Sequence, residues 1–174
     1  MKQRTTEQWK GLSNLPALLN ELPVLVEELG FRYYSFSFVS PDHEVNSGNL
    51  QPGGQTLIQT VLDSCPARHQ RPALPIPWNA DLFCTTPQLW AQAQTLGLCH
   101  GWIQPTYLGA THSSLTLLRP YDRISLAECY AKTAAVMWLA ERLHLAATQA
   151  ETSLTSTHDT CCLLYTSDAA DEED

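Results

Sequence analysis

Residues 31–39 read Phe-Arg-Tyr-Tyr-Ser-Phe-Ser-Phe-Val, and large and small side chains alternate along them. Successive side chains of a strand point to opposite faces of a sheet, so this stretch predicts a strand with two different faces. One face carries the large aromatic residues Tyr34, Phe36 and Phe38. The other has Ser35 and Ser37 in its middle, which leaves volume beside the sheet. Either a ligand or large side chains from a neighbouring helix would fill that volume, because protein interiors are close-packed.

A helix is predicted immediately before this strand. Leucine and valine recur at helical spacing over residues 15–29, and Asn14 precedes them as an N-cap. Pro23 lacks the N–H that the preceding turn needs, so it predicts a bend or a restart. Gly30 marks the end of the helix. A shorter opening helix is predicted within residues 5–12 from capping-box spacing.

The rest of the chain alternates short strands with helices. In order, the sequence predicts an edge strand at 44–47, a helix at 55–64, an extended proline-rich stretch at 66–78, a helix from Thr86-Pro87 to Gly97, strands at 100–107 and 113–118, and a helix from Ser125 to about Ala147. Strands that follow one another in pairs favour an antiparallel sheet. The predicted fold class is therefore α+β, an α-β-α sandwich whose central antiparallel sheet is covered by helices on both faces.

Length and charge narrow the possible functions. The chain has 174 residues, which suits one domain better than two. Its net charge is −8, but five of its 18 acidic residues lie in the last seven positions, and without them 10 basic residues face 13 acidic ones. No cluster of lysine and arginine offers an electrostatic footprint for nucleic acid. No apolar run approaches the roughly 18 residues of a membrane span, and no secretory h-region follows Met1, so we expect a cytoplasmic protein without membrane contact.

The sequence offers little to support enzymatic chemistry. Phosphate-binding, nucleophile-elbow, zinc-protease and dinucleotide motifs are all missing from it. His112 beside Ser113 and Ser114 could form a hydrolytic pair, but a loop histidine of this kind is more often a hydrogen-bonded surface feature. The six cysteines have no C-x-x-C spacing, which predicts reduced, buried thiols rather than disulfides or a metal site. We therefore expect that the protein is not an enzyme and that it holds no metal ion and no cofactor.

Three residues suit a binding pocket better. Asp63 ends an apolar helix, where its carboxylate would face the interior or its rim. Thr116 stands mid-strand between two leucines, and prolines at 75 and 77 hold the backbone before Trp78 extended. A carboxylate, a hydroxyl and an aromatic wall together suit a small amphiphile with an amide head. Each residue also has an ordinary role, as a solvated helix end, a β-former and a core aromatic, respectively.

Several segments recur together in one known family. They are Leu29-Gly30-Phe31 before the aromatic strand, Leu74-Pro75-Ile76-Pro77-Trp78, and Gly97-Leu98-Cys99-His100-Gly101-Trp102-Ile103-Gln104-Pro105. The last is similar to the signature G-[LIV]-x-x-G-x-x-x-P, and a glycine loop and a strand follow it as expected. In their order and spacing the segments resemble the autoinducer-binding domain of LuxR-type quorum-sensing regulators over about residues 15–145. This family also has an α-β-α sandwich fold.

The resemblance implies a signal site and a homodimer. Asp63 matches the aspartate that accepts the amide N–H of an acyl-homoserine lactone, and Trp78 matches a tryptophan near the lactone head. Thr116 matches the residue that contacts the acyl carbonyl, while Ser35 and Ser37 match positions that line the acyl chain. Trp102 is a further candidate for the pocket wall. The small-molecule signal would be such a lactone or a related amphiphile, and DNA would be bound only through a separate C-terminal domain.

Departures from the family pattern support an alternative. Residues 46–54 replace the segment Y-P-x-x-W-x-x-x-Y, so the tryptophan that donates to the lactone carbonyl is missing, and Ser64 stands where proline is expected. Losing such a donor costs about 1–3 kcal/mol, roughly tenfold to hundredfold in affinity. The pattern is most similar to orphan virulence and quorum-sensing regulators of pseudomonads, which diverge at the same kind of position. The alternative is a ligand-independent interaction module whose former pocket is filled by side chains such as Trp102.

The C-terminal residues suggest an unnatural ending. From Cys162 the chain reads Cys-Leu-Leu-Tyr-Thr-Ser-Asp-Ala-Ala-Asp-Glu, which resembles the translation of a sequencing-library adapter, although an acidic tail would also read this way. The predicted organisation is a sensory and dimerisation domain at 1–147, a linker at 148–161 and an adapter-derived tail at 162–174. The family's helix-turn-helix domain would begin past Thr160, beyond this junction.

Overall fold

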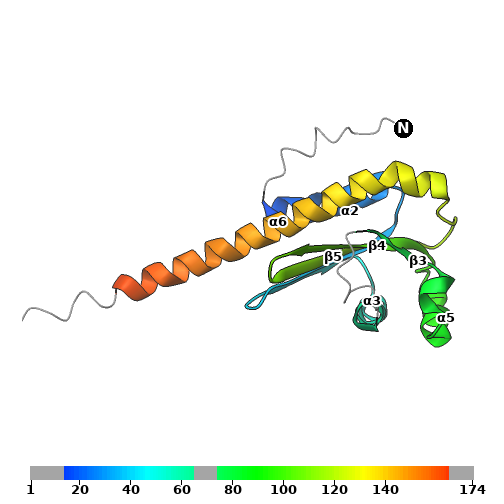
Figure 1. Cartoon of the computed structure of the whole chain (residues 1–174), viewed down its shortest axis with the longest axis horizontal. Helices are drawn as coiled ribbons and strands as arrows, with labels where there is room; N and C mark the ends of the chain where they lie inside the picture. Colours follow the sequence, from blue (N-terminus) through cyan, green and yellow to red (C-terminus); the bar gives the residue numbers. More distant parts are fainter. Residues whose placement is uncertain (1–13, 65–73, 165–174) are drawn as a thin grey trace, which may run out of the picture.

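The fold is a three-layer sandwich built on one five-stranded sheet (Figure 1). The computed structural model describes residues 14–64 and 74–164, with side chains described up to residue 153. In chain order the elements are α2 (Leu15–Glu28), β1 (Tyr33–Val39), β2 (Glu44–Gly48), α3 (Pro52–Ser64), β3 (Ile76–Trp78), the 3-10 helix η1 (Ala80–Phe83), α5 (Pro87–Thr95), β4 (His100–Leu108), β5 (Thr111–Arg119) and α6 (Leu126–Leu164). The predicted opening helix within residues 5–12 lies outside the described residues.

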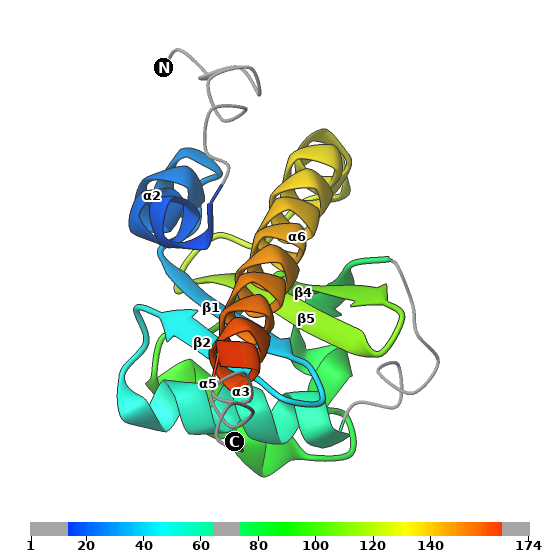
Figure 2. The same ribbon diagram turned by 90° about the vertical axis from the view of Figure 1, so that its left-hand side faces the viewer.

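The sheet is antiparallel throughout, with the strand order β2-β1-β5-β4-β3. Helices α2 and α6 cover one face and α3 and α5 cover the other, an arrangement that Figures 1 and 2 show from two directions. The predicted α-β-α sandwich is confirmed. The two short strands β2 and β3 form the edges, and Pro77 in β3 suits an edge because proline cannot donate to a further strand.

Each face of the sheet carries its own hydrophobic core, as the alternation of β1 predicts. Tyr34, Phe36 and Phe38 pack with α2 and α6, and the buried positions of α6 run from Val136 to Ala147. The opposite core joins α3, α5 and η1 to the other face of the strands. Ser35 and Ser37 belong to that second face.

Two predictions about the helices need correction. Of the bend or restart predicted at Pro23, the restart does not occur, because α2 runs unbroken from Leu15 to Glu28. Pro23 is exposed, so the carbonyl that loses its helical partner can be hydrated. Helix α3 begins at Pro52, three residues earlier than predicted. Proline suits a first helical position, and Gly54 packs so tightly that a Cβ there would lie 3.3 Å from Leu98 Cδ1.

Helix α6 is the longest element of the described chain. It was expected to end near Ala147 but continues to Leu164, through the stretch predicted to be a linker. Its inner face covers the sheet up to Ala147, and Glu151 still contacts the Ser40 hydroxyl. Beyond that contact the helix extends past the sheet (Figure 1).

Candidate functional site

A row of small hydroxyl side chains crosses the middle of the sheet on its α3 face. Ser35 of β1 lies directly opposite Thr116 of β5, and the next pair on this face is Ser37 with Ser114. Ser35 and Thr116 are buried, whereas Ser37 and Ser114 are half-buried. Strand alternation and antiparallel register therefore bring together three of the residues that the sequence singled out.

The two buried hydroxyls differ in their hydrogen bonding. Ser35 Oγ donates to Gln55 Oε1 of α3 at 3.2 Å, so a neighbouring helix fills the space beside this residue. Thr116 Oγ1 is buried and has no hydrogen-bond partner among the residues that the structure describes. A buried hydroxyl without a partner costs about 1–3 kcal/mol, so this position invites an acceptor.

Trp78 lies on the same face, one pair further along each strand. It is opposite Gly101, whose other neighbour Leu118 is two residues from Thr116. Its indole Nε1 donates to the Leu98 carbonyl at 2.8 Å, and its ring meets Phe83 edge-on at 5.0 Å. Trp78 therefore acts as a core aromatic whose N–H is already used.

Asp63 does not face the interior, the first of the two positions, interior or rim, that the sequence suggested for it. It is exposed, and its Oδ1 accepts a hydrogen bond from Gln59 Nε2 at 3.0 Å. Helical geometry places it on the side of α3 opposite Leu57, Ile58 and Val61, which pack on the sheet. The contact with a ligand amide that the family resemblance implies for Asp63 stays a prediction.

Trp102 lies on the other face of the sheet from Ser35 and Thr116. It pairs with Leu117 across β4 and β5, and its ring meets Phe31 edge-on at 5.0 Å. The expectation that Trp102 shares one pocket with the hydroxyl row, or fills that pocket, is therefore wrong. Its indole Nε1 is buried and unpartnered in the part of the chain that the structure describes.

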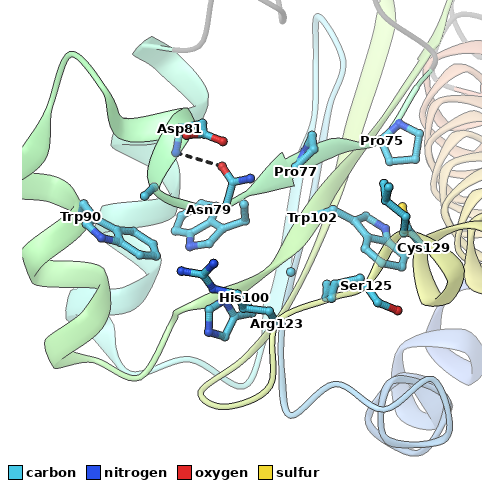
Figure 3. Close-up of a pocket in the computed structure, with 15 residues that line it drawn as sticks. Pro75, Pro77, Asn79, Asp81, Trp90, His100, Trp102, Arg123, Ser125 and Cys129 are labelled. Atoms are coloured by element: carbon cyan, nitrogen blue, oxygen red, sulfur yellow. Dashed lines mark hydrogen bonds between the residues drawn. The ribbon is translucent and has the colours of Figure 1, made fainter.

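A cavity of about 360 Å³ lies where the β3–β4 edge meets the start of α6 (Figure 3). Its lining includes Trp78, Trp90 and Trp102, which give it an apolar character. His100 and Arg123 meet at one end of it, and Trp102 and Cys129 lie at the other. We call it the edge cavity. Burial, followed by the positive charges of Arg123 and Arg119, lowers the pKa of His100.

The serine–histidine contact in the structure is not the one that the sequence suggested. Ser113 Oγ lies 2.9 Å from Nδ1 of His144 on α6, whereas His112 stacks on Tyr107. His144 Nε2 lies 3.1 Å from Thr111 Oγ1. His144 and Ser113 are both buried, so this pair joins α6 to β5 rather than meeting a substrate.

The three cysteines with described side chains are free, but they are not all buried as the sequence predicted. Cys84 is exposed, and Cys99 and Cys129 are half-buried; burial raises the pKa of the Cys99 thiol. Cys65, Cys161 and Cys162 carry no described side chain. Within residues 14–64 and 74–153, no group of histidine, cysteine and acidic residues is placed to hold a metal ion. None of the described helices is long and apolar enough to cross a membrane.

Comparison with known proteins shows which of them this chain resembles in sequence and in fold. No protein-family model matches the chain. Over 75 residues, 42% of the chain, it is 32% identical to the transcriptional activator protein PhzR of Pseudomonas fluorescens. The match covers 31% of PhzR, about a third of that protein's length.

Two solved structures share the fold over most of the chain. Escherichia coli SdiA, solved in complex with octanoyl-rac-glycerol, has a TM-score of 0.66 at 17% identity, covering 87% of this chain and 69% of SdiA. CepR2 of Burkholderia cenocepacia, an N-acylhomoserine lactone dependent LuxR family transcription factor, has a TM-score of 0.62 at 20% identity, covering 76% of this chain and 84% of CepR2. The resemblance that the motifs indicated is confirmed, and the chain has the fold of a LuxR-type autoinducer-binding domain.

Proposed function

We propose that this chain is the signal-sensing and dimerisation domain of a transcriptional regulator in quorum sensing. The fold and the similarity to PhzR support this role. The proposed signal is an acyl-homoserine lactone or a related amphiphile, since CepR2 depends on the former and SdiA was solved with an octanoyl glycerol. The regulator would act in the cytoplasm and contact DNA through a separate helix-turn-helix domain.

The observation that carries the proposal is the unpartnered hydroxyl of Thr116. An acyl carbonyl placed beside it would accept its hydrogen bond and remove the cost of burying it alone. The hydroxyl row leads from Thr116 and Ser35 to the half-buried Ser37, where the space beside the sheet is less completely covered. This row offers a course for an acyl chain over the α3 face, with Trp78 at its other end.

A thermal-unfolding series with lactones of increasing acyl length tests the proposal. A ligand that binds only the folded chain must raise its melting temperature, and at a hundred times Kd the gain in stability is about 2.7 kcal/mol. We expect the largest rise at one preferred chain length. If no lactone at saturating concentration moves the melting temperature, lactone sensing is excluded.

Two variants identify the face that holds the ligand. Thr116→Val keeps the shape of the side chain and removes its donor, so lactone affinity should fall about tenfold while the free protein stays folded. Asp63→Asn, on the exposed side of α3, should leave affinity unchanged in the arrangement seen here. If instead the Asp63 variant loses binding, α3 must turn this carboxylate toward the ligand.

A ligand-independent interaction module is the second candidate, and one contact favours it. Gln55 of α3 reaches Ser35 directly, so α3 already occupies part of the space in which an acyl chain would lie. The missing tryptophan donor of residues 46–54 would weaken lactone binding further. This candidate predicts that no lactone of the series changes the melting temperature and that adding lactone leaves the oligomeric state unchanged.

The proposed dimer surface is the outward stripe of α6. It consists of Leu126, Tyr130, Ala134, Met137, Glu141 and Leu145, which are spaced three or four residues apart and are exposed. Leu126 and Tyr130 are 78% and 81% exposed, which is unusual for large apolar side chains on an otherwise well-packed helix. We propose that a second copy covers this stripe through the same surface, as a two-fold dimer requires.

A further inference from the structure

We infer that the edge cavity is a second ligand site, which takes a small carboxylate with an apolar body. It adjoins the proposed lactone site at Trp78 but differs from it, because it opens at the β3–β4 edge and the start of α6, not over the hydroxyl row. Its volume of about 360 Å³ falls in the range of small-molecule pockets. The inference does not depend on the proposed function.

The charged residues at one end of the cavity determine which head group a ligand would have. Arg123 lines the cavity beside His100 (Figure 3). Arginine presents a planar pair of N–H donors that matches a carboxylate, and it keeps its charge at all physiological pH values. Arg119 also acts on His100, but its guanidinium is already paired with Glu128, and Asp122 opposes both arginines, so Arg123 is the arginine offered to the head group. Asp81 is the acidic residue in the lining, and in Figure 3 it lies beside Asn79, away from Arg123.

Aromatic rings determine the body of the ligand. The indoles of Trp78, Trp90 and Trp102 line the cavity, together with Pro75 and Pro77. These flat apolar walls suit a ring or a short alkyl chain. Trp102 adds a buried N–H that has no partner within the described part of the chain; it lies at the end of the cavity away from Arg123, so only a ligand with an acceptor at its far end would satisfy it.

The position of the cavity gives the ligand a structural consequence. Arg123 and Leu126 belong to the connection and first turn of α6, whereas His100 and Trp102 belong to β4. A carboxylate held between them would fasten the start of α6 to the sheet edge. The ligand would therefore stabilise the end of the helix nearest the proposed dimer stripe.

The test uses 1-naphthoate and its uncharged analogue 1-naphthamide, followed by NMR of the indole N–H groups. We expect the signals of Trp78, Trp90 and Trp102 to shift with naphthoate while that of Trp138 stays in place. The amide should bind at least about tenfold more weakly, because it lacks the charge-assisted hydrogen bond. Arg123→Gln should reduce naphthoate affinity to that of the amide, and Arg32→Gln, an exposed arginine at the start of β1, should leave it unchanged.

Three outcomes would overturn the inference. The first is no indole shift at millimolar naphthoate. The second is equal affinity for acid and amide in the unaltered protein, a comparison that does not depend on any variant folding. The third is displacement of naphthoate by saturating octanoyl-homoserine lactone, which would assign both molecules to one site. If lactone fails to bind at all while naphthoate still shifts these indoles, the edge cavity stands and only the proposed lactone response falls.

Discussion

At the scale of single residues, the informative side chains are polar groups buried in apolar layers. Thr116 has no partner, whereas His144 is fully engaged between Ser113 and Thr111 and meets Phe38 edge-on. Burial, with a smaller contribution from His112, lowers the pKa of His144. The first residue therefore points to binding and the second to stability.

The buried histidine predicts a pH-dependent stability. The ordinary pKa of histidine is 6.5, and that of His144 is lower in the folded chain. Below pH 6.5 the unfolded chain binds a proton at this histidine, whereas folded His144 stays neutral. The free energy of unfolding should therefore decrease as the pH is lowered, by up to about 1.4 kcal/mol per pH unit for this proton. His100 shifts in the same direction and adds to the slope.

Urea unfolding at pH 5.5 and 7.5 measures this slope. His144→Gln should flatten it, and His43→Gln, at an exposed position, should not. An equal slope in the unaltered chain and the His144 variant would contradict the prediction.

The sequence predicted the positions of some of these residues but not of others. Alternation in β1 correctly placed Ser35 and Ser37 on one face, because a period of two depends only on the strand itself. It could not pair His144 with Ser113, since the two come from elements that meet only when α6 folds onto β5. The inward orientation considered for Asp63 was inferred from its place at the end of an apolar helix, but the apolar spacing of α3 puts it opposite Leu57 and Val61.

At the scale of elements, α6 is held at its start by a cluster of charges. Ser125 caps the helix by accepting the Glu128 N–H at 3.1 Å. The Glu128 carboxylate does not reach back as a capping box would, because Arg119 of β5 holds both of its oxygens at 2.8 Å. Lys132 adds a further contact, and these hydrogen bonds lower the pKa of Glu128 to about 2 despite its partial burial.

Removing this charge should loosen the start of α6. We expect Glu128→Gln to lower the free energy of unfolding by about 1–2 kcal/mol at neutral pH, since the carboxylate is only partly buried. A carboxyl whose pKa is depressed stabilises the fold above its ordinary value of 4.5, and the gain is lost as pH falls toward 2. The difference in the free energy of unfolding between the variant and the parent chain should therefore disappear as the pH falls from 4.5 toward 2.

Chemical unfolding across pH 2–7 checks this prediction, with Glu27→Gln on the exposed side of α2 as the matched control. A loss that persists unchanged at pH 2 would show that the charge is not its cause.

Element boundaries were predictable where a local signal existed. Asn14 accepts from the Ala17 N–H, and Gly30 adopts a positive φ of 79°, as the cap and stop signals of α2 require. The end of α6 was not predictable from the threonines and serines after residue 147. The hydroxyls described among them, those of Thr148, Thr152 and Ser153, bond back to carbonyls one turn earlier and so remain compatible with a helix.

At the scale of the whole molecule, the two faces of the sheet have different tasks. The α3 face carries the hydroxyl row, and the α2–α6 face carries the larger core and presents the outward stripe of α6. The edge cavity reaches residues of both faces, since Trp78 and Trp102 both line it. No pattern in the sequence indicated this cavity, because β3, β4 and the start of α6 meet there only through tertiary packing.

The dimer proposal is tested at this scale. We expect the chain to have twice its monomer mass in light scattering, and Tyr130→Glu to return it to a monomer because a charge would be buried on the stripe. Tyr121→Glu, equally exposed but in the loop before α6, should leave the dimer intact. A parent chain that stays monomeric at high micromolar concentration rules out this surface.

The unbroken course of α6 has a mechanical consequence. At 1.5 Å per residue, the 39 residues of α6 make a rod of roughly 58 Å, which packs on the sheet up to Ala147, still contacts Ser40 at Glu151, and reaches beyond the globular body after that. A small tilt of the packed part of α6 displaces the far end of the helix in proportion to the length of the segment that extends beyond the sheet. A ligand that shifts the packed part of α6 against the sheet would therefore move the far end of the helix furthest.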